Sequence, residues 1–169
     1  MRIEHKLNYK YKILILISLI VIVLASPLTA TDLKYNVEKV EHNFNNPWSS
    51  ATLPNGDILV TELIGKIKRI DIKTREVIDI NGIPNALFRG QGGLSDIILH
   101  PEFEKNSIVL ISFSYGEKNK NTLKVISAEL IRNELMNKKI IFEATPYRKS
   151  SNHYGARLVF LNDNSLIIT

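Results

Sequence analysis

From residue 31 onward, short apolar segments alternate with turn-forming residues, and no stretch has a long 3.6-residue apolar period. Apolar and β-branched segments of this length, bounded by Gly, Pro, Asn and Asp, predict β-strands. The predicted strands cover residues 49–53, 58–62, 66–72, 76–80, 94–99, 108–115, 122–130 and 156–161. For residues 129–138 the pattern also allows a helical turn. The chain is therefore predicted to be all-β.

An internal repeat groups these strands into larger units. An apolar residue, a polar turn and an apolar strand ending in a hydroxyl residue occur as LPNGDILVT and as LNDNSLIIT, with a looser copy at 100–112. The final hydroxyl residues, Thr61, Ser112 and Thr169, are 51 and 57 positions apart. Four-stranded propeller blades recur about every 40 to 50 residues, and longer loops stretch this period. The repeat predicts a β-propeller; the alternative is a β-sandwich with coincidental turns.

This spacing places only two to three blades in the chain, whereas closed propellers have about four to eight. We therefore expect residues 31–169 to be an incomplete, N-terminal part of a propeller. Such an open arrangement exposes sheet edges and apolar faces that further blades would cover, so we expect this part to fold poorly in isolation.

The first 30 residues have the pattern of a signal peptide. Four basic residues precede an apolar run at 13–25. This run of 13 residues is shorter than the about 20 that a straight transmembrane helix needs. Pro27 then ends the helix, and Leu28-Thr29-Ala30 offers a small-residue cleavage site. We expect export to the periplasm or the extracellular space with removal of residues 1–30, and an uncleaved membrane anchor is the alternative.

Composition narrows the possible partners and chemistry. The net charge is +5, but four of the 22 basic and one of the 17 acidic residues belong to the leader, which leaves +2 for the rest. A net charge this small gives no indication of a basic surface that binds nucleic acid. The absence of cysteine excludes disulfides, thiolate metal sites and a cysteine nucleophile. The HExxH, Walker, GxGxxG and GxSxG signatures are also absent.

Two loops carry the remaining candidate chemistry. In the first, three glycines surround Gln91, so the backbone can approach a ligand and the amide can both donate and accept hydrogen bonds. The second contains Asn152 and His153, of which the histidine is suited to general-base catalysis near neutral pH. On composition alone, an ordinary glycine turn and a solvated or hydrogen-bonded histidine are the favoured interpretations. His100, followed by Pro101, fits a structural turn, and Arg157 fits pairing with a carboxylate.

Seven short segments together resemble the glucose/sorbosone dehydrogenase family of soluble, pyrroloquinoline quinone (PQQ)-dependent enzymes. They are NPW at 46–48, LPNG with LVTE at 53–62, GKI at 65–67, GIP at 82–84, GQGGLSD at 90–96, LHPEF at 99–103 and NHYGARLVF at 152–160. The resemblance implies a six-bladed β-propeller that oxidises aldose sugars at the anomeric carbon. The electrons would pass through PQQ to an external acceptor.

The same resemblance implies roles for particular residues. His153 would take the sugar's hydroxyl proton as general base, while Gln91 and Asn152 would lie near substrate and cofactor. Glucose-oxidising members have Asp where this chain has Asn152, so the broader aldose dehydrogenase branch is the nearer match. The family's basic PQQ-binding residues and Ca²⁺ ligands belong to later blades, so we expect the fragment alone to be inactive. A non-catalytic, exported propeller that serves as a binding module is the alternative.

Overall fold

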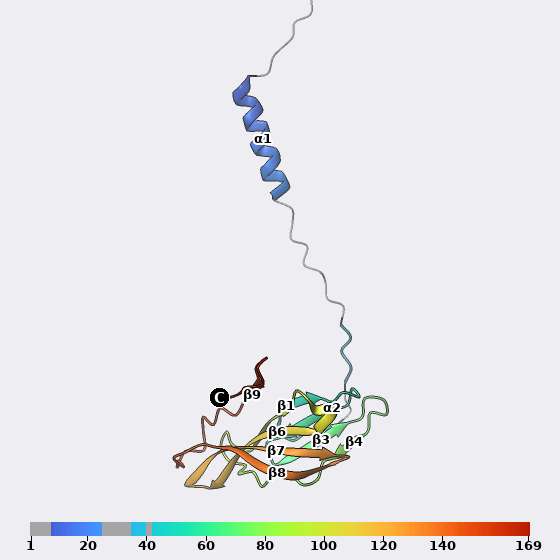
Figure 1. The fold of residues 1–169 in the computed structure, drawn as a ribbon, viewed down its shortest axis with the longest axis vertical. Helices are drawn as coiled ribbons and strands as arrows, with labels where there is room; N and C mark the ends of the chain where they lie inside the picture. The colour runs from blue at the N-terminus through green and yellow to red at the C-terminus, as the bar shows by residue number, and fades with distance from the viewer. Residues whose placement is uncertain (1–7, 25–34, 40–41) are drawn as a thin grey trace, which may run out of the picture. The chain divides into compact units, whose positions relative to one another are not determined.

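The computed structural model describes residues 8–24, 35–39 and 42–169. The chain divides into two units, Met1–Lys39 and Val40–Thr169. In the first, helix α1 (Tyr9–Leu24) covers most of the apolar run of the predicted signal sequence (Figure 1). The predicted cleavage site lies outside the described residues. Within the described segments, no helix is both long and apolar enough to cross a membrane.

The second unit begins with a four-stranded antiparallel sheet in the order β1-β2-β3-β4. Its strands are β1 (Pro47–Thr52), β2 (Ile58–Glu62), β3 (Lys66–Ile70) and β4 (Val77–Asp79). The predicted turn at 54–57 joins the first two, because the N–H of Leu53 binds the carbonyl of Asp57 and the N–H of Gly56 binds the carbonyl of Leu53, both at 2.8 Å. Alternation along β2 and β3 buries Leu59 and Ile67 on one face.

A second antiparallel sheet follows, in the order β5-β6-β7-β8. Its elements are β5 (Leu94–Leu99), the short helix α2 (Phe103–Asn106), β6 (Ile108–Glu117), β7 (Lys120–Ile131) and β8 (Glu134–Glu143). The helical alternative at 129–138 is wrong, since these residues end β7 and begin β8. The chain then forms a hairpin of β9 (Leu158–Phe160) and β10 (Leu166–Ile168).

The repeat predicted from the sequence corresponds to a hairpin that recurs in the structure. In the last hairpin the N–H of Leu161 binds the carbonyl of Ser165 at 2.8 Å, which reproduces the Leu53–Asp57 bond of the first sheet. In the looser copy at 100–112, the N–H of His100 binds the carbonyl of Ile108 at 2.9 Å, and helix α2 lies in the loop between these two residues. Two complete blades and the first two strands of a third are thus present, as predicted, and the all-β class is confirmed.

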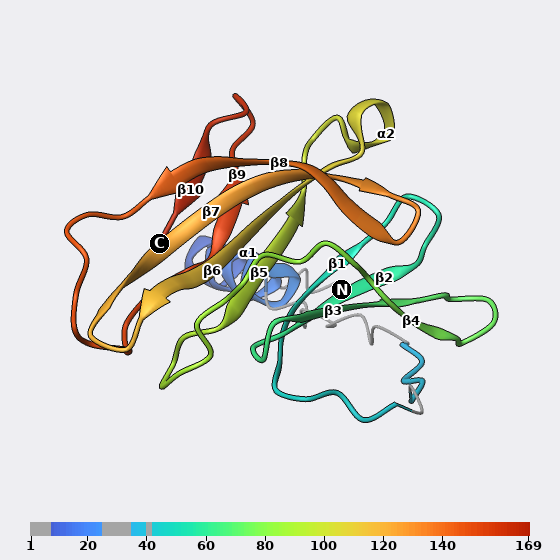
Figure 2. The same ribbon diagram turned by 90° about the horizontal axis from the view of Figure 1, so that it is seen from below.

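The first sheet and the β9–β10 hairpin lie on opposite sides of the second sheet, and alternate residues of β6 face them (Figure 2). Val109 and Ile111 join a buried cluster with residues of the first sheet, whereas Leu110 joins a cluster with Leu158 of β9. Both faces of this strand are therefore covered, which explains why its apolar residues are continuous rather than alternating.

The repeated hydroxyl residues connect one blade to the next. The buried Thr61 hydroxyl donates to the carbonyl of Ser95 at 2.6 Å, and the buried Ser112 hydroxyl donates to the carbonyl of Ala156 at 2.6 Å. In each case the donor lies in or beside the second strand of one blade, and the acceptor lies in or just before the first strand of the following blade. The polar position in the repeat thus satisfies backbone groups that the sheets leave unpaired.

Candidate functional site

The two candidate loops lie together although they are far apart in sequence. Gln91 precedes β5 and His153 precedes β9, the first strands of successive blades. The side-chain oxygen of Gln91 accepts the backbone N–H of His153 at 2.8 Å, and the backbone N–H of Gln91 donates to the carbonyl of Ser151 at 2.9 Å. The fold therefore joins the predicted base and the predicted amide in one polar cluster.

Glycines make this contact sterically possible. A Cβ atom on Gly90, which has φ +59°, would lie 2.6 Å from the carbonyl oxygen of Ser151 and 2.9 Å from the side-chain oxygen of Asn152. A Cβ on Gly92 would lie 2.8 Å from a ring carbon of Tyr154, the residue after His153. Real Cβ atoms do not approach other atoms this closely, so the glycines around Gln91 allow the two loops to touch.

The backbone of His153 is held on both sides. It adopts a left-handed conformation, φ +57°, which costs a non-glycine residue of the order of 1 kcal/mol or more. Gln91 binds its N–H, and Arg148 donates from Nη1 to its carbonyl oxygen at 2.9 Å. These two bonds stabilise the strained backbone and fix where the imidazole leaves the chain.

The next residue anchors the loop in the protein interior. Tyr154 is buried, and its hydroxyl donates to the side-chain oxygen of the fully buried Asn121 at 2.6 Å. Burial raises the pKa of Tyr154 above its ordinary value. The Arg148 guanidinium lies 4.5 Å from the Tyr154 ring centre, so one cation contacts both the anchor and the His153 carbonyl. Arg148 stands four residues before Asn152, outside any recognisable motif, and sequence reasoning missed it.

The His153 side chain itself is exposed. Within residues 42–169 no hydrogen bond to its ring is found. The residue also borders a hollow of about 270 Å³ between the second sheet and the last hairpin. Asn152 is exposed as well, and its side-chain oxygen lies against Gly90 rather than against the imidazole. The loop thus presents an exposed imidazole whose backbone, rather than its ring, is bound by the amide of Gln91.

His100 has a different environment. Its Nδ1 accepts the N–H of Glu102 at 3.1 Å, and its ring packs edge-on against Phe160 at 5.5 Å between centres. The predicted structural role of His100 in a turn is confirmed. Arg157 also pairs with a carboxylate, as expected, with its Nη1 3.4 Å from Asp96. Across the described residues, no group of three or more His, Asp or Glu side chains forms a candidate metal site.

Comparison with known proteins agrees with this architecture. The model of the Glucose / Sorbosone dehydrogenase family matches residues 44–169. The chain belongs to this family. It is 30% identical over 153 residues to the aldose sugar dehydrogenase YliI of Escherichia coli. The aligned region covers 87% of this chain and 41% of that protein.

Solved structures of sugar dehydrogenases superpose on more than three quarters of this chain. A crystal structure of a glucose dehydrogenase matches with a TM-score of 0.74 and 30% identity, over 79% of this chain and 40% of the other. The PQQ-bound aldose sugar dehydrogenase of Streptomyces coelicolor matches with a TM-score of 0.64 and 28% identity, over 77% and 39%. The chain thus spans about two fifths of the length of these relatives.

Proposed function

We propose that this chain is the N-terminal part of an exported, PQQ-dependent dehydrogenase that oxidises aldose sugars at the anomeric carbon, with His153 as the general base. The observation that carries the proposal is the Gln91–His153 contact. It holds the histidine by its backbone, at 2.8 Å, and leaves the exposed ring free for a substrate. Membership in the Glucose / Sorbosone dehydrogenase family, which has a PQQ-bound relative, supports the proposed substrate class and cofactor.

In this proposal, His153 takes the proton of the anomeric hydroxyl at a ring nitrogen as that carbon is oxidised. Removing the proton prevents positive charge from building up on the oxygen, which is the usual contribution of a general base. Because the Gln91 oxygen is occupied by the His153 N–H, its amide nitrogen remains as the donor toward a sugar oxygen or the quinone. The bound quinone would accept the hydride.

The described residues are suited to contact the reacting edge of bound PQQ, but they are less suited to bind the carboxylates of PQQ. His153 and Gln91 offer a proton acceptor and an amide donor on exposed loops. The nearby guanidinium groups already bind protein groups: Arg89 the carbonyl of Lys118, Arg148 the carbonyl of His153 and Arg157 the carboxylate of Asp96. We infer that the basic residues that bind the carboxylates, and the Ca²⁺ ligands, belong to later blades.

Asn152 refines the proposed chemistry. Being neutral, it cannot raise the basicity of His153 by its charge, as an aspartate would. Its contact with Gly90 gives it a role in loop packing. We therefore propose that the backbone bonds to Gln91 and Arg148 orient His153. We also propose that the enzyme accepts aldose sugars in general. The physiological electron acceptor would be an external molecule.

The test replaces His153 in a complete propeller, in which this chain is followed by the later blades. Glutamine has similar polar volume but cannot accept a proton at neutral pH. We expect His153→Gln to lower the turnover rate of dye-linked aldose oxidation by about 100- to 10,000-fold. PQQ loading, followed by quinone absorbance with saturating Ca²⁺, should stay near normal.

His100→Gln is the matched control, because His100 is bound within its own turn. We expect it to affect stability more than turnover. Near-normal turnover in both variants would refute the role of His153 and favour the non-catalytic binding module.

A further inference from the structure

We propose that Asp96 is the positioning residue that fixes the Gln91 loop and the His153 loop relative to each other. The inference rests on the proposed function only for its catalytic consequence. Asp96 lies in β5, is 2% exposed and contacts the first strands of all three blades present.

The bonds of the Asp96 carboxylate reach in both directions around the propeller. Oδ2 accepts the backbone N–H of Leu158 in β9 at 2.8 Å. Oδ1 accepts the hydroxyl of Ser49 in β1 at 2.5 Å and the N–H of Ile97 at 3.0 Å. Hydrogen bonds to a buried, ionised acceptor are about twice as strong as neutral ones, so these bonds restrain both neighbouring strands.

β5 and β9 belong to different sheets, so no backbone ladder joins them. A single backbone bond, from the N–H of Gln91 to the carbonyl of Ser151 at 2.9 Å, is found between segments 91–96 and 151–158. Side-chain bonds therefore contribute much of the restraint between these two segments. The bond from Asp96 to Leu158 and the bond from Gln91 to His153 both join positions 62 apart. Segments 91–96 and 153–158 thus run side by side and are tied at both ends, one end by the candidate catalytic pair and the other by Asp96.

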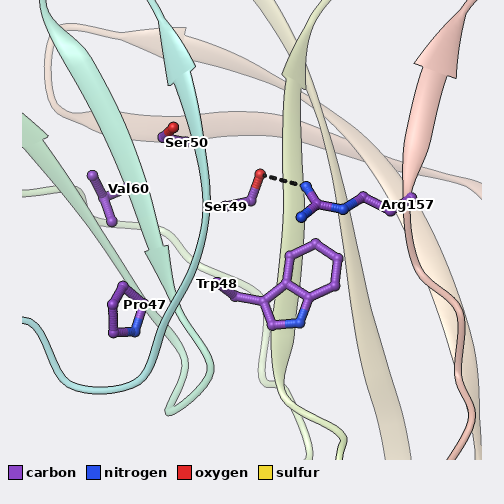
Figure 3. Close-up of a pocket in the computed structure, with 6 residues that line it drawn as sticks. All are labelled: Pro47, Trp48, Ser49, Ser50, Val60 and Arg157. Atoms are coloured by element: carbon purple, nitrogen blue, oxygen red, sulfur yellow. Dashed lines mark hydrogen bonds between the residues drawn. The ribbon is translucent and has the colours of Figure 1, made fainter.

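Arg157 extends this network toward the first blade. Its guanidinium lies 4.2 Å from the centre of the Trp48 ring and 3.3 Å from the Ser49 hydroxyl, at the edge of a hollow of about 360 Å³ (Figure 3). Its side chain is 61% exposed and its Nη1 is 3.4 Å from Asp96, so the ion pair itself is weak. The tie between strands therefore depends mainly on the bonds to Leu158 and Ser49.

The substitution Asp96→Asn tests this tie. It keeps the side-chain volume but replaces one carboxylate oxygen by an NH₂ group. Each carboxylate oxygen of Asp96 accepts a backbone N–H, which an NH₂ group cannot do, so at least one hydrogen bond is lost. We expect amide hydrogen exchange in residues 150–158 of the complete propeller to become about 10-fold faster or more. This is the factor that corresponds to the loss of one hydrogen bond to a charged group. Emission of Trp48, the only tryptophan, should shift as Arg157 moves.

Asp57→Asn is the matched control. Asp57 is also buried, at 3% exposure, but its partners Asn55, Arg69 and Ile72 all lie within the first blade or its connecting turns. We expect this control to speed exchange near residues 54–72 and to leave residues 150–158 and the Trp48 emission unchanged. Equal responses of residues 150–158 to both variants, or no response to Asp96→Asn, would overturn the proposal.

If Asp96→Asn does not fold, Ser49→Ala decides the question. It leaves the carboxylate in place and removes the hydroxyl that donates to Oδ1 and accepts from Nη1 of Arg157. We expect exchange at residues 150–158 to rise about 3-fold, less than for Asp96→Asn, because the carboxylate keeps its bond to the N–H of Leu158. A shift of Trp48 emission should accompany it. No change in either measurement would overturn the proposal.

Turnover in the complete, PQQ-loaded propeller separates the two proposals. Asp96→Asn should lower kcat about 10-fold or more, because small displacements of a base are costly, while His100→Gln does not. Loosened loops with an unchanged kcat would remove the positioning role. Loosened loops and reduced kcat in Asp96→Asn, alongside normal turnover in His153→Gln, would refute only the assignment of the base.

Discussion

The side-chain oxygen of Gln91 lies 2.8 Å from the backbone nitrogen of His153, and this bond joins loops from successive blades. Because an N–H donates, the oxygen of the amide must face His153, and its NH₂ group faces the other way. The oxygen of Gln91 therefore holds the histidine backbone, and under the proposed function its nitrogen would donate to the ligand. A change in the distance between these loops alters both.

Gly90 provides a steric test of this contact. Gly90→Ala places a Cβ 2.6 Å from the Ser151 carbonyl oxygen, whereas a Cβ on Gly65 meets nothing within 4 Å, although both glycines have positive φ. We expect each alanine to cost about 1 kcal/mol or more of unfolding free energy through its backbone conformation. Gly90→Ala should cost about 1 to 3 kcal/mol in addition, because of the clash.

Urea unfolding measures the difference, and hydrogen exchange at residues 150–154 locates it. Equal losses of stability for the two alanines, with unchanged exchange in the His153 loop, would show that the loops do not depend on the Gly90 contact.

Much of the fold follows from local sequence. The turn at 54–57 and its counterpart at 162–165 are visible because each returns the chain after an apolar strand, and the hydroxyl positions Thr61 and Ser112 repeat at blade spacing. Their bonds to the next blade explain why a polar residue stands at the end of each apolar strand. A period of this kind predicts blades because each blade reuses the same turn and the same polar position.

The outer strand β8 (Glu134–Glu143) was missed for a physical reason. Nearly all of its residues are exposed, so no buried face imposes the alternation that identifies a strand. The ties between blades were missed for another reason. The bonds of Gln91 to His153 and of Asp96 to Leu158 depend on how two blades stack, which no local pattern encodes.

Thr61 tests whether the repeated hydroxyl stabilises the blade interface. Thr61→Val keeps the shape but leaves the buried Ser95 carbonyl without its 2.6 Å donor. We expect the unfolding free energy to fall by about 1 to 3 kcal/mol, the cost of a buried, unsatisfied acceptor. Thr74→Val, at an exposed turn position, is the control, and a loss no larger than its loss would refute the interface role.

The N-terminal leader gives a prediction about processing. We expect protein recovered from the cell envelope or medium to begin at or near Thr31, because the apolar run of 13 residues at 13–25 is short for an anchor. N-terminal sequencing or intact-mass analysis checks this expectation. Membrane-bound protein that retains Met1 would instead support the uncleaved anchor.

Asp57 gives the first hairpin a dependence on pH. Burial by itself would raise the pKa of this carboxyl, but hydrogen bonds from Asn55, Arg69 and the Ile72 N–H outweigh it and hold the pKa below its ordinary value. A lowered pKa in the folded state means that the unfolded chain binds the proton more readily. The stabilisation is therefore complete above the unfolded pKa of about 3.9 and is lost as the pH falls through the lower, folded-state pKa.

Asp57→Asn removes this pH dependence together with the ion pair to Arg69, whose Nη2 lies 2.6 Å from the carboxylate. We expect the variant to be less stable than the parent protein at pH 7, and the difference in unfolding free energy to shrink as the pH falls from 5 to about 3. Asp163→Asn, an exposed residue of the corresponding hairpin in the last blade, should change this profile little, because solvent screens its interactions. Urea unfolding at several pH values gives the three profiles. A constant gap between the parent protein and Asp57→Asn would mean that Asp57 does not stabilise the fold through its lowered pKa.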